Sequence, residues 1–286
     1  MSEITFVAPY VQLPPTQAEL PCDDGVPMET ARHKAQMDLL IDALIPWLEQ
    51  RDDGYVGGNM FVYYNLAQVR NKDFKGPDFF AVLGVPKGER RSWVVWEEEK
   101  APDVVIELLS ESTAEADKNQ KKLIYQNRMR VPDYFWYDPF NPDDWAGFSL
   151  QQGRYQPIKP NAQNQLICQS LGLALQCWQG NYRGIDAVWL RWATLEGELL
   201  PTPQEIAQDE QQRAEQERQQ AEQERQRAEQ ERQRAEQERQ RANKAELQLL
   251  QTARNLLETG MSVEQVAQLT SLDSSEIEKL RPNAEL

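Results

Sequence analysis

The residues best suited to chemistry in this sequence are acidic side chains placed within apolar runs. Glu107 lies inside the run DVVIELL, residues 103–109, where alternation puts its carboxylate among the apolar neighbours of a central strand. A buried carboxylate without a partner costs several kcal/mol, so Glu107 requires one. The partner is either a structural Arg or Lys, or a metal ion.

A second carboxylate, Asp78, follows Gly76-Pro77 and opens the apolar run DFFAVLG. An adjacent strand would bring it beside Glu107, and the pair would supply the hard oxygen ligands that Mg²⁺ (or Mn²⁺) prefers. Asp103 lies on the same strand face as Glu107, but four residues separate the two by about 13 Å, too far to share one ion. We expect Asp103 to support the entrance of the strand.

The segment after the Glu107 strand predicts a helix over 110–128. Asp117, Lys121 and Tyr125 are spaced at four residues and therefore share one helix face, which would lean over the end of the strand. Lys121 is a candidate third member of the site. An ordinary solvated helix lysine is the alternative.

The elements that must position these side chains show both helix and strand patterns. After Thr30, apolar residues recur at helical spacing as far as Leu48, which predicts a capped helix. Strand patterns separated by Gly and Pro turns follow at 59–69, 78–85, 92–98, 103–109 and 134–139, and around Phe148, Tyr155 and Ile167. The sequence therefore predicts an α/β fold with a mixed central sheet flanked by helices.

Core-forming residues stop well before the end of the chain. All eight Trp lie between Trp47 and Trp192, so the ability to build a core ends near residue 200. We expect an extended N-terminal segment over 1–29, a folded domain over 30–200, a charged heptad-repeat helix over 201–246 and a small helical tail over 247–286.

The charged helix repeats the motif RAEQERQ, with Ala at every seventh position: Ala214, Ala221, Ala228, Ala235 and Ala242. Glu and Arg at (i, i+3) spacing stabilise a single helix by about 0.2–0.5 kcal/mol per pair. Ala buries little surface in a seam. The repeat is therefore either a solvated single helix serving as a spacer or a weak coiled-coil homodimer.

The tail shows two short helical patterns broken at Gly260 and Ser271. Its expected small core consists of Leu256, Val263, Val266, Leu269 and Ile277. A helix-turn-helix is the alternative, but basic residues are too few for a firm grip on phosphate.

Composition narrows the function further. Acidic residues outnumber basic ones by 46 to 31, for a formal net charge of -15. Tight general binding of nucleic acid by phosphate neutralisation is therefore disfavoured, whereas a local metal-dependent site is not. The three cysteines show no metal-ligand spacing, and no run is apolar enough to span a membrane. We expect a reduced, cytoplasmic protein without a membrane role.

The ordered motifs resemble the Uma-two-type "putative restriction endonuclease" family of the PD-(D/E)XK nuclease superfamily. The similarity is carried by GPDF at 76–79, PDVVIELLSEST at 102–113, the Asp117, Lys121 and Tyr125 triplet, and VPDYFWYDP at 131–139. It covers roughly residues 20–195 and implies a restriction-endonuclease-like core. It does not cover the repeat.

Carried over by position, the resemblance implies that Asp78 and Glu107 ligate a divalent metal. Lys121 would replace the strand lysine that other members of the superfamily place two residues after the glutamate, a position held here by Leu109. Glu29 lies where such nucleases often add an acidic residue. For the neighbouring His33, a capping or packing role is expected.

The resemblance implies a Mg²⁺-dependent endonuclease that hydrolyses phosphodiester bonds, with DNA as the substrate. RNA and branched DNA stay open, because the chemistry sees a phosphodiester and is largely indifferent to the sugar. The alternative from another class is a catalytically inactive nuclease-like scaffold that uses the charged helix and tail for protein interaction.

Overall fold

The computed structural model describes residues 14–22, 28–65 and 74–281. The chain divides into two compact units, Met1–Gln208 and Asp209–Leu286. The first unit is a mixed α/β domain, and the second consists of helices. The finer division into four parts, with boundaries at 29, 200 and 246, stays a prediction.

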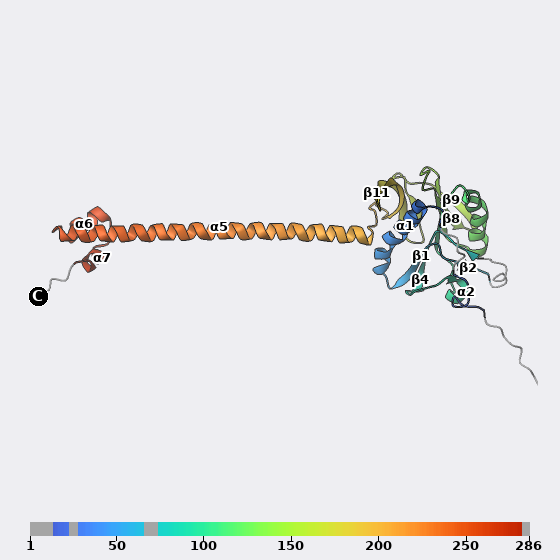
Figure 1. Cartoon of the computed structure of the whole chain (residues 1–286), viewed down its shortest axis with the longest axis horizontal. Coiled ribbons are helices and arrows are strands. Elements are labelled where there is room, and N and C mark those ends of the chain that lie inside the picture. The colour runs from blue at the N-terminus through green and yellow to red at the C-terminus, as the bar shows by residue number, and fades with distance from the viewer. Residues whose placement is uncertain (1–13, 23–27, 66–73, 282–286) are drawn as a thin grey trace, which may run out of the picture. The chain divides into compact units, whose positions relative to one another are not determined.

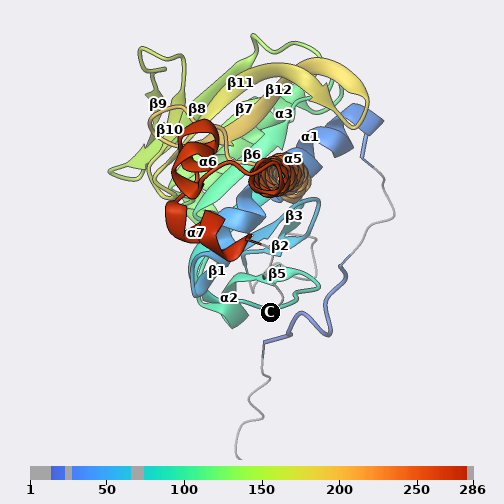
Figure 2. The same ribbon diagram turned by 90° about the vertical axis from the view of Figure 1, so that its left-hand side faces the viewer.

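A six-stranded sheet forms the centre of the first unit, in the order β1-β4-β6-β7-β8-β9 (Figures 1 and 2). The parallel pair β6–β7 lies among antiparallel neighbours, so the sheet is mixed, as predicted. Its strands are β1 (Asp53–Gly57), β4 (Phe79–Pro86), β6 (Val104–Leu108), β7 (Asp133–Tyr137), β8 (Trp145–Gln151) and β9 (Arg154–Ile158).

Helix α1 (Ala31–Glu49) packs on one face of this sheet. The predicted cap is confirmed, because the Thr30 side chain accepts a hydrogen bond from the His33 backbone N–H. Leu40 and Leu44 of α1 enter a core with Ile106 and other sheet residues. A three-stranded sheet completes this layer, with β10 (Leu166–Cys168), β11 (Leu173–Tyr182) and β12 (Ile185–Ala193).

The opposite face is covered by one continuous helical segment from Ala114 to Met129. It contains two π-helical turns, in the order α3 (Ala114–Ala116), η2 (Asp117–Lys121), α4 (Lys122–Ile124) and η3 (Tyr125–Met129). The helix predicted over 110–128 is thus confirmed, with a later start. The π-helical turns were not predicted, because such turns depend on contacts with the rest of the fold rather than on the local helix propensity of their residues.

Two predicted strands are largely wrong. Of the run 59–69, only β2 (Val62–Tyr63) is a strand, and residues 66–69 lie outside the described residues. The run 92–98 forms β5 (Trp93–Val94) and then the short helix α2 (Val95–Glu98). Glu98 at the end of this helix pairs with Arg90, Nε to Oε1 at 2.6 Å. Strands β2 and β5 form a small sheet with β3 (Phe74–Lys75).

The sequence patterns predicted no strand at β1 or at the hairpin of β11 and β12. The remaining predicted strands correspond to β4, β6, β7, β8, β9 and β10, with ends shifted by a few residues. Sequence patterns of this kind fix the existence of an element better than its ends.

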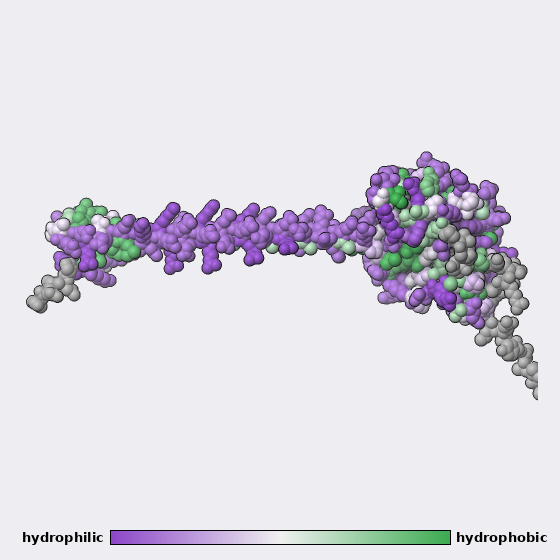
Figure 3. Space-filling model, in the orientation of Figure 1, coloured by the Kyte–Doolittle hydropathy of each residue, from purple (hydrophilic) through white to green (hydrophobic). Residues whose placement is uncertain are grey.

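The second unit contains most of α5 (Pro203–Glu258), followed by α6 (Val263–Thr270) and α7 (Ser274–Lys279). Figure 3 shows a hydrophilic surface along the repeat, in keeping with its exposed residues. The tail core contains Ala253, Val263, Val266 and Ile277, with Leu256 packed against it. Leu269 was predicted in this core but is 64% exposed, because it falls on the outer face of α6. No helix in the described ranges is long and apolar enough to cross a membrane.

The Gln36 side chain ties α1 to the edge of β12. It accepts a hydrogen bond from the Leu190 N–H at 2.9 Å and donates one to the Leu190 carbonyl at 2.8 Å, fully buried. We predict that Gln36→Ala lowers the free energy of unfolding by about 2–4 kcal/mol, because two buried backbone groups lose their partner. Denaturant unfolding measures this, with exposed Glu49→Ala as the control. Equal stability of the two variants would contradict the prediction.

Candidate active site

Glu107 lies on β6 and faces the helical segment 114–129. Residues 104, 106 and 108 enter the core under α1, whereas Val105 enters the opposite core, so alternation places Glu107 on the side of Val105. Its side chain is fully buried. The Tyr125 hydroxyl donates a hydrogen bond to Glu107 Oε1 at 2.6 Å, and Lys121 Nζ donates to Oε2 at 3.1 Å.

Asp78 precedes β4 and lies beside the end of β6. Phe79 pairs with Ile106 in the antiparallel register, and the next pair in this register is Asp78 with Glu107. Residues opposite each other in such a pair place their side chains on the same face. Asp78 Oδ2 also accepts a hydrogen bond from the Leu108 N–H at 2.7 Å, which fixes the carboxylate against β6.

The predicted helix face is formed as expected, with all three residues directed at the sheet. Lys121 Nζ lies 2.6 Å from Asp117 Oδ1 and 3.1 Å from Glu107 Oε2, so it joins two carboxylates. The Tyr134 hydroxyl donates to the Asp117 carbonyl at 2.8 Å and anchors this turn to β7. Asp117 is fully buried, and its Oδ2 has no hydrogen-bond partner among the described residues.

Burial and nearby charges shift the pKa values of Asp78, Glu107 and Lys121. Burial, followed by the negative charge of Glu107, raises the pKa of Asp78 well above its ordinary value. Burial also raises the pKa of Glu107, although Lys121 opposes that shift. Burial alone would lower the pKa of Lys121, but Glu107 and Asp117 outweigh it and raise that pKa, so the ammonium stays charged.

The balance of charge in this cluster is negative. Three carboxylates, from Asp78, Glu107 and Asp117, face the single ammonium of Lys121. With all four groups ionised the cluster carries two excess negative charges, which the raised carboxyl pKa values relieve by protonation. A divalent cation would relieve the same excess, and Mg²⁺ is commonly held by one or two carboxylates together with water and substrate phosphate. The residues present therefore fit such an ion.

A strict all-protein cage is absent, however. Within the described part of the chain, no three His, Cys, Asp or Glu side chains are grouped closely enough to hold a metal. Of the three carboxylates of the cluster, Asp78 and Glu107 lie opposite each other in the register of β4 and β6 with their side chains on one face, so the remaining ligands of an ion would be water and substrate.

A hollow of about 460 Å³ is lined by Asp78 and Lys121 of this cluster, whereas Glu107 and Asp117 are fully buried behind them. Glu29 also lines the hollow and accepts a hydrogen bond from Ser110 Oγ at 3.3 Å. Asn59 and Lys75 also line it. Sequence reasoning missed these last two, although Lys75 immediately precedes the GPDF motif.

Asp103 is not part of the cluster. Its Oδ2 accepts a hydrogen bond from the Leu83 N–H at 2.7 Å and pairs with Lys100 Nζ at 3.0 Å. These contacts join the start of β6 to β4, so Asp103 supports the sheet at the end away from Glu107.

His33 packs rather than reacts, as expected. Its buried ring lies 2.9 Å from the Leu109 carbonyl through Nε2, and 2.9 Å from Thr30 Oγ1 through Nδ1. A carbonyl only accepts, so Nε2 carries the proton and Nδ1 accepts from Thr30. The strand position two residues after Glu107 is the buried Leu109, and its carbonyl is thus fixed by α1.

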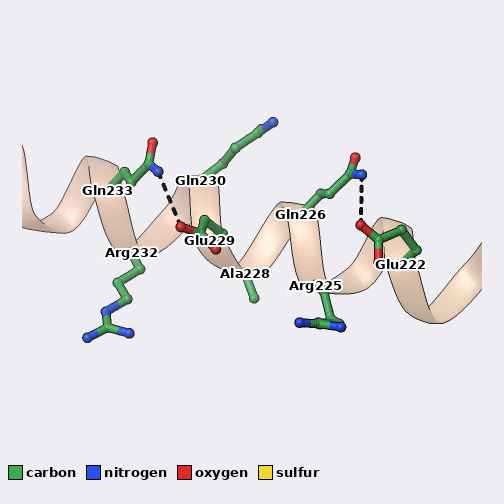
Figure 4. Close-up of a pocket in the computed structure, with 8 residues that line it drawn as sticks. All are labelled: Glu222, Arg225, Gln226, Ala228, Glu229, Gln230, Arg232 and Gln233. Carbon is green, nitrogen blue, oxygen red and sulfur yellow. Dashed lines mark hydrogen bonds between the residues drawn. The ribbon is translucent and has the colours of Figure 1, made fainter.

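A further hollow along α5 is no site. Its lining runs from Glu222 to Gln233 on one helix. Figure 4 shows these side chains projecting from the ribbon without an opposing wall. The space is simply the gap between exposed side chains.

Comparison with known proteins gives two family matches. The sequence profile of the Uma2 family, described as "Putative restriction endonuclease", matches residues 7–188. A second profile, described as "Helicobacter pylori protein of unknown function (DUF874)", matches residues 194–278. No curated protein sequence matches the chain.

Among solved structures, the chain is similar to the crystal structure of a "putative nuclease belonging to DUF820" from Anabaena variabilis ATCC 29413. The sequence identity is 17% and the TM-score is 0.36. The similar region covers 52% of this chain and 87% of that one.

Proposed function

The chain belongs to the Uma2 family, and from this premise we propose that its first unit is a metal-dependent endonuclease acting on DNA. The observation that supports this most strongly is the cluster of Asp78, Glu107 and Lys121, which has an excess of negative charge and of which Asp78 and Lys121 line an open hollow. A phosphodiester entering that hollow would meet both the ion and the ammonium.

In the proposed site, Asp78 and Glu107 hold Mg²⁺ or Mn²⁺ through carboxylate oxygens. The bound ion would polarise the phosphate and lower the pKa of a coordinated water. Asp78 is kept in place by the Leu108 N–H, and Glu107 by the Tyr125 hydroxyl. Burial, followed by the charge of Glu107, raises the pKa of Tyr125 well above its ordinary value, so the hydroxyl keeps its proton and keeps donating.

We assign Lys121 the role of stabilising negative charge that develops on the phosphate, or of positioning the attacking water. Asp117 holds the ammonium from the other side at 2.6 Å and keeps it protonated. The lysine side chain is 24% exposed and lines the hollow.

The divalent ion would also offset the repulsion between this acidic protein and the phosphates of its substrate. A protein with a net charge of -15 repels a polyanion, and the two carboxylates would repel the phosphate most strongly. An ion held between them reverses the local sign where the phosphate must approach.

We also propose that α5 is unpaired. If Ala228 is taken as position a of a heptad, Arg232 and Arg234 flank the seam; if it is position d, Glu229 and Glu231 flank it. In a homodimer the e position of one helix faces g of the other when the helices are parallel, and each faces its own kind when they are antiparallel. Because e and g carry the same residue type here, like charges meet in both arrangements. A seam of Ala offers little burial to offset that repulsion.

The catalytic proposal predicts a graded loss of activity. Asp78→Asn and Glu107→Ala should abolish Mg²⁺-dependent DNA cleavage, because each removes a proposed ligand. Lys121→Ala should lower kcat by about 10²–10³-fold, the usual scale for a lost charge stabiliser, while metal binding persists. Lys122→Ala and Glu115→Gln, on the same helical segment, are the matched controls. Full Mg²⁺-dependent cleavage by Glu107→Ala would sink the assignment.

The raised carboxyl pKa values predict a metal-linked dependence of stability on pH. Because the pKa of Asp78 is raised in the folded state above its ordinary value of 3.8, its contribution to the free energy of unfolding is present below that value. The contribution is lost as pH rises through the raised pKa. We expect Mg²⁺ to restore the lost stability at neutral pH, and to bind more weakly as the carboxyls protonate.

Denaturant unfolding with and without Mg²⁺ across this pH range, together with calorimetric titration, measures the linkage. Asp78→Asn keeps an acceptor for the Leu108 N–H but removes the charge, so it should be insensitive to Mg²⁺ and more stable without it at neutral pH. Absence of Mg²⁺ and Mn²⁺ binding to the wild type would favour an inactive scaffold instead.

For α5 we predict a monomer. Sedimentation velocity of the full chain at high concentration should give a single species with the mass of one chain, 33.1 kDa. Raised salt screens the flanking charges and provides the control condition. A dimer at low salt would contradict the proposal.

A further inference from the structure

A second hollow, of about 530 Å³, lies beside the proposed active site. Its volume falls within the roughly 300–1,000 Å³ typical of small-molecule sites. Glu29 and Ser112 line both this hollow and the one that opens onto Asp78 and Lys121. A chain whose phosphate occupies the first hollow can therefore extend directly into the second.

Phe140 forms an exposed aromatic wall of this second hollow. Its side chain is 58% exposed, an unusual position for a large apolar ring. The ring is nevertheless held in place: the Arg32 guanidinium lies 4.8 Å from its centroid and the His33 ring 5.7 Å away. The backbone N–H of Phe140 donates to Asp138 Oδ1 at 2.8 Å. The result is a fixed flat surface with one side open.

The lining of this hollow also includes acidic side chains. Glu29, Glu111 and Asp138 contribute three carboxylates to the hollow. Glu111 makes no hydrogen bond or ion pair within the described ranges, and Asp138 uses Oδ1 alone, for the N–H groups of Phe140 and Asn141. Such a surface repels a second phosphate, but it accepts hydrogen bonds from amino groups.

We propose that this hollow binds a single unpaired nucleobase next to the scissile phosphate, stacked on Phe140. The inference rests on the proposed nuclease function of the adjacent site. An aromatic ring is the side chain on which unpaired bases stack, at about 1–3 kcal/mol per base. Carboxylate acceptors favour bases with an exocyclic amino group, as in the pairing of Glu or Asp with cytosine N4. The base taken is therefore cytosine, adenine or guanine rather than thymine.

The proposed base pocket determines which class of DNA the site would cleave. A base inside a regular duplex is stacked and paired, and reaches such a hollow only by leaving the helix. The substrate is therefore single-stranded DNA, or a duplex with an unpaired or displaced nucleotide at the cleavage position, rather than a fully paired duplex.

The first experiment compares cleavage of two duplexes that differ only by one bulged cytosine. With Mg²⁺, wild type should cleave the bulged duplex at least tenfold faster in kcat/KM than the paired one. Phe140→Ala should remove about tenfold or more of kcat/KM on the bulged substrate, the scale of one lost stacking contact. Phe140→Trp should retain it, and Leu195→Ala, an exposed apolar residue outside the hollow, should match wild type. Equal cleavage of both duplexes, or full activity of Phe140→Ala, would overturn the proposal.

The second experiment separates this proposal from the catalytic one, because it needs neither metal nor cleavage. Deoxycytidine titrated into the metal-free full chain should give saturable shifts of the backbone amide NMR signals of residues 110–112, 138, 140 and 141. Thymidine should bind more weakly, and Phe140→Ala should show no saturation. Deoxycytidine binding without any cleavage would refute the nuclease alone. Cleavage without nucleoside binding would refute the base pocket alone.

Discussion

The structure depends on one electrostatic constraint: the carboxylates of Asp78 and Glu107 are packed under a helical segment that directs one ammonium, that of Lys121, toward them. Glu107 is fully buried and Asp78 stands next to it in the register of β4 and β6. Low-dielectric surroundings make their repulsion costly. The Lys121 ammonium, the Tyr125 hydroxyl and the Leu108 N–H each offset part of that cost by direct contact.

The rest of the domain fixes the geometry that this cluster requires. On one face α1 packs against the sheet, and His33 holds the carbonyl of Leu109 just past the end of β6. On the other face, the Tyr134 hydroxyl of β7 donates a hydrogen bond to the carbonyl of Asp117, where the π-helical turn starts. The site is thus clamped from both sides of the sheet, so that small movements of either layer would change distances between charges.

The sequence predicted the parts of this arrangement that depend on periodicity. Asp78, Glu107, Lys121 and Tyr125 were singled out because alternation and four-residue spacing determine which side chains share a face, and the structure brings these four together. Asp103 lies at the far end of β6, as its calculated separation indicated. Periodicity does not predict how segments that are distant in the sequence are aligned with one another.

For that reason β1, the helical α2, the exposed Leu269 and the hollow beside Phe140 were not predicted. Phe140 follows Asp138-Pro139 in a turn, and nothing in the local sequence reveals that Arg32, more than one hundred residues earlier, lies over its ring. The π-helical turns were not predicted for a similar reason. Their residues are ordinary helix formers, and only the need to seat three side chains on one strand selects the wider turn.

Lys121 lies on a helical segment rather than on the strand of Glu107, so the side chains of the site come from two separate elements. The sheet alone contributes both proposed ligands, whereas the helical segment alone contributes the positive side chain. A brief detachment of that segment would leave an ion in place but withdraw the ammonium. In the proposed site, ion binding and the placement of the ammonium would therefore depend on different elements of the fold, and the docking of the helical segment would connect them.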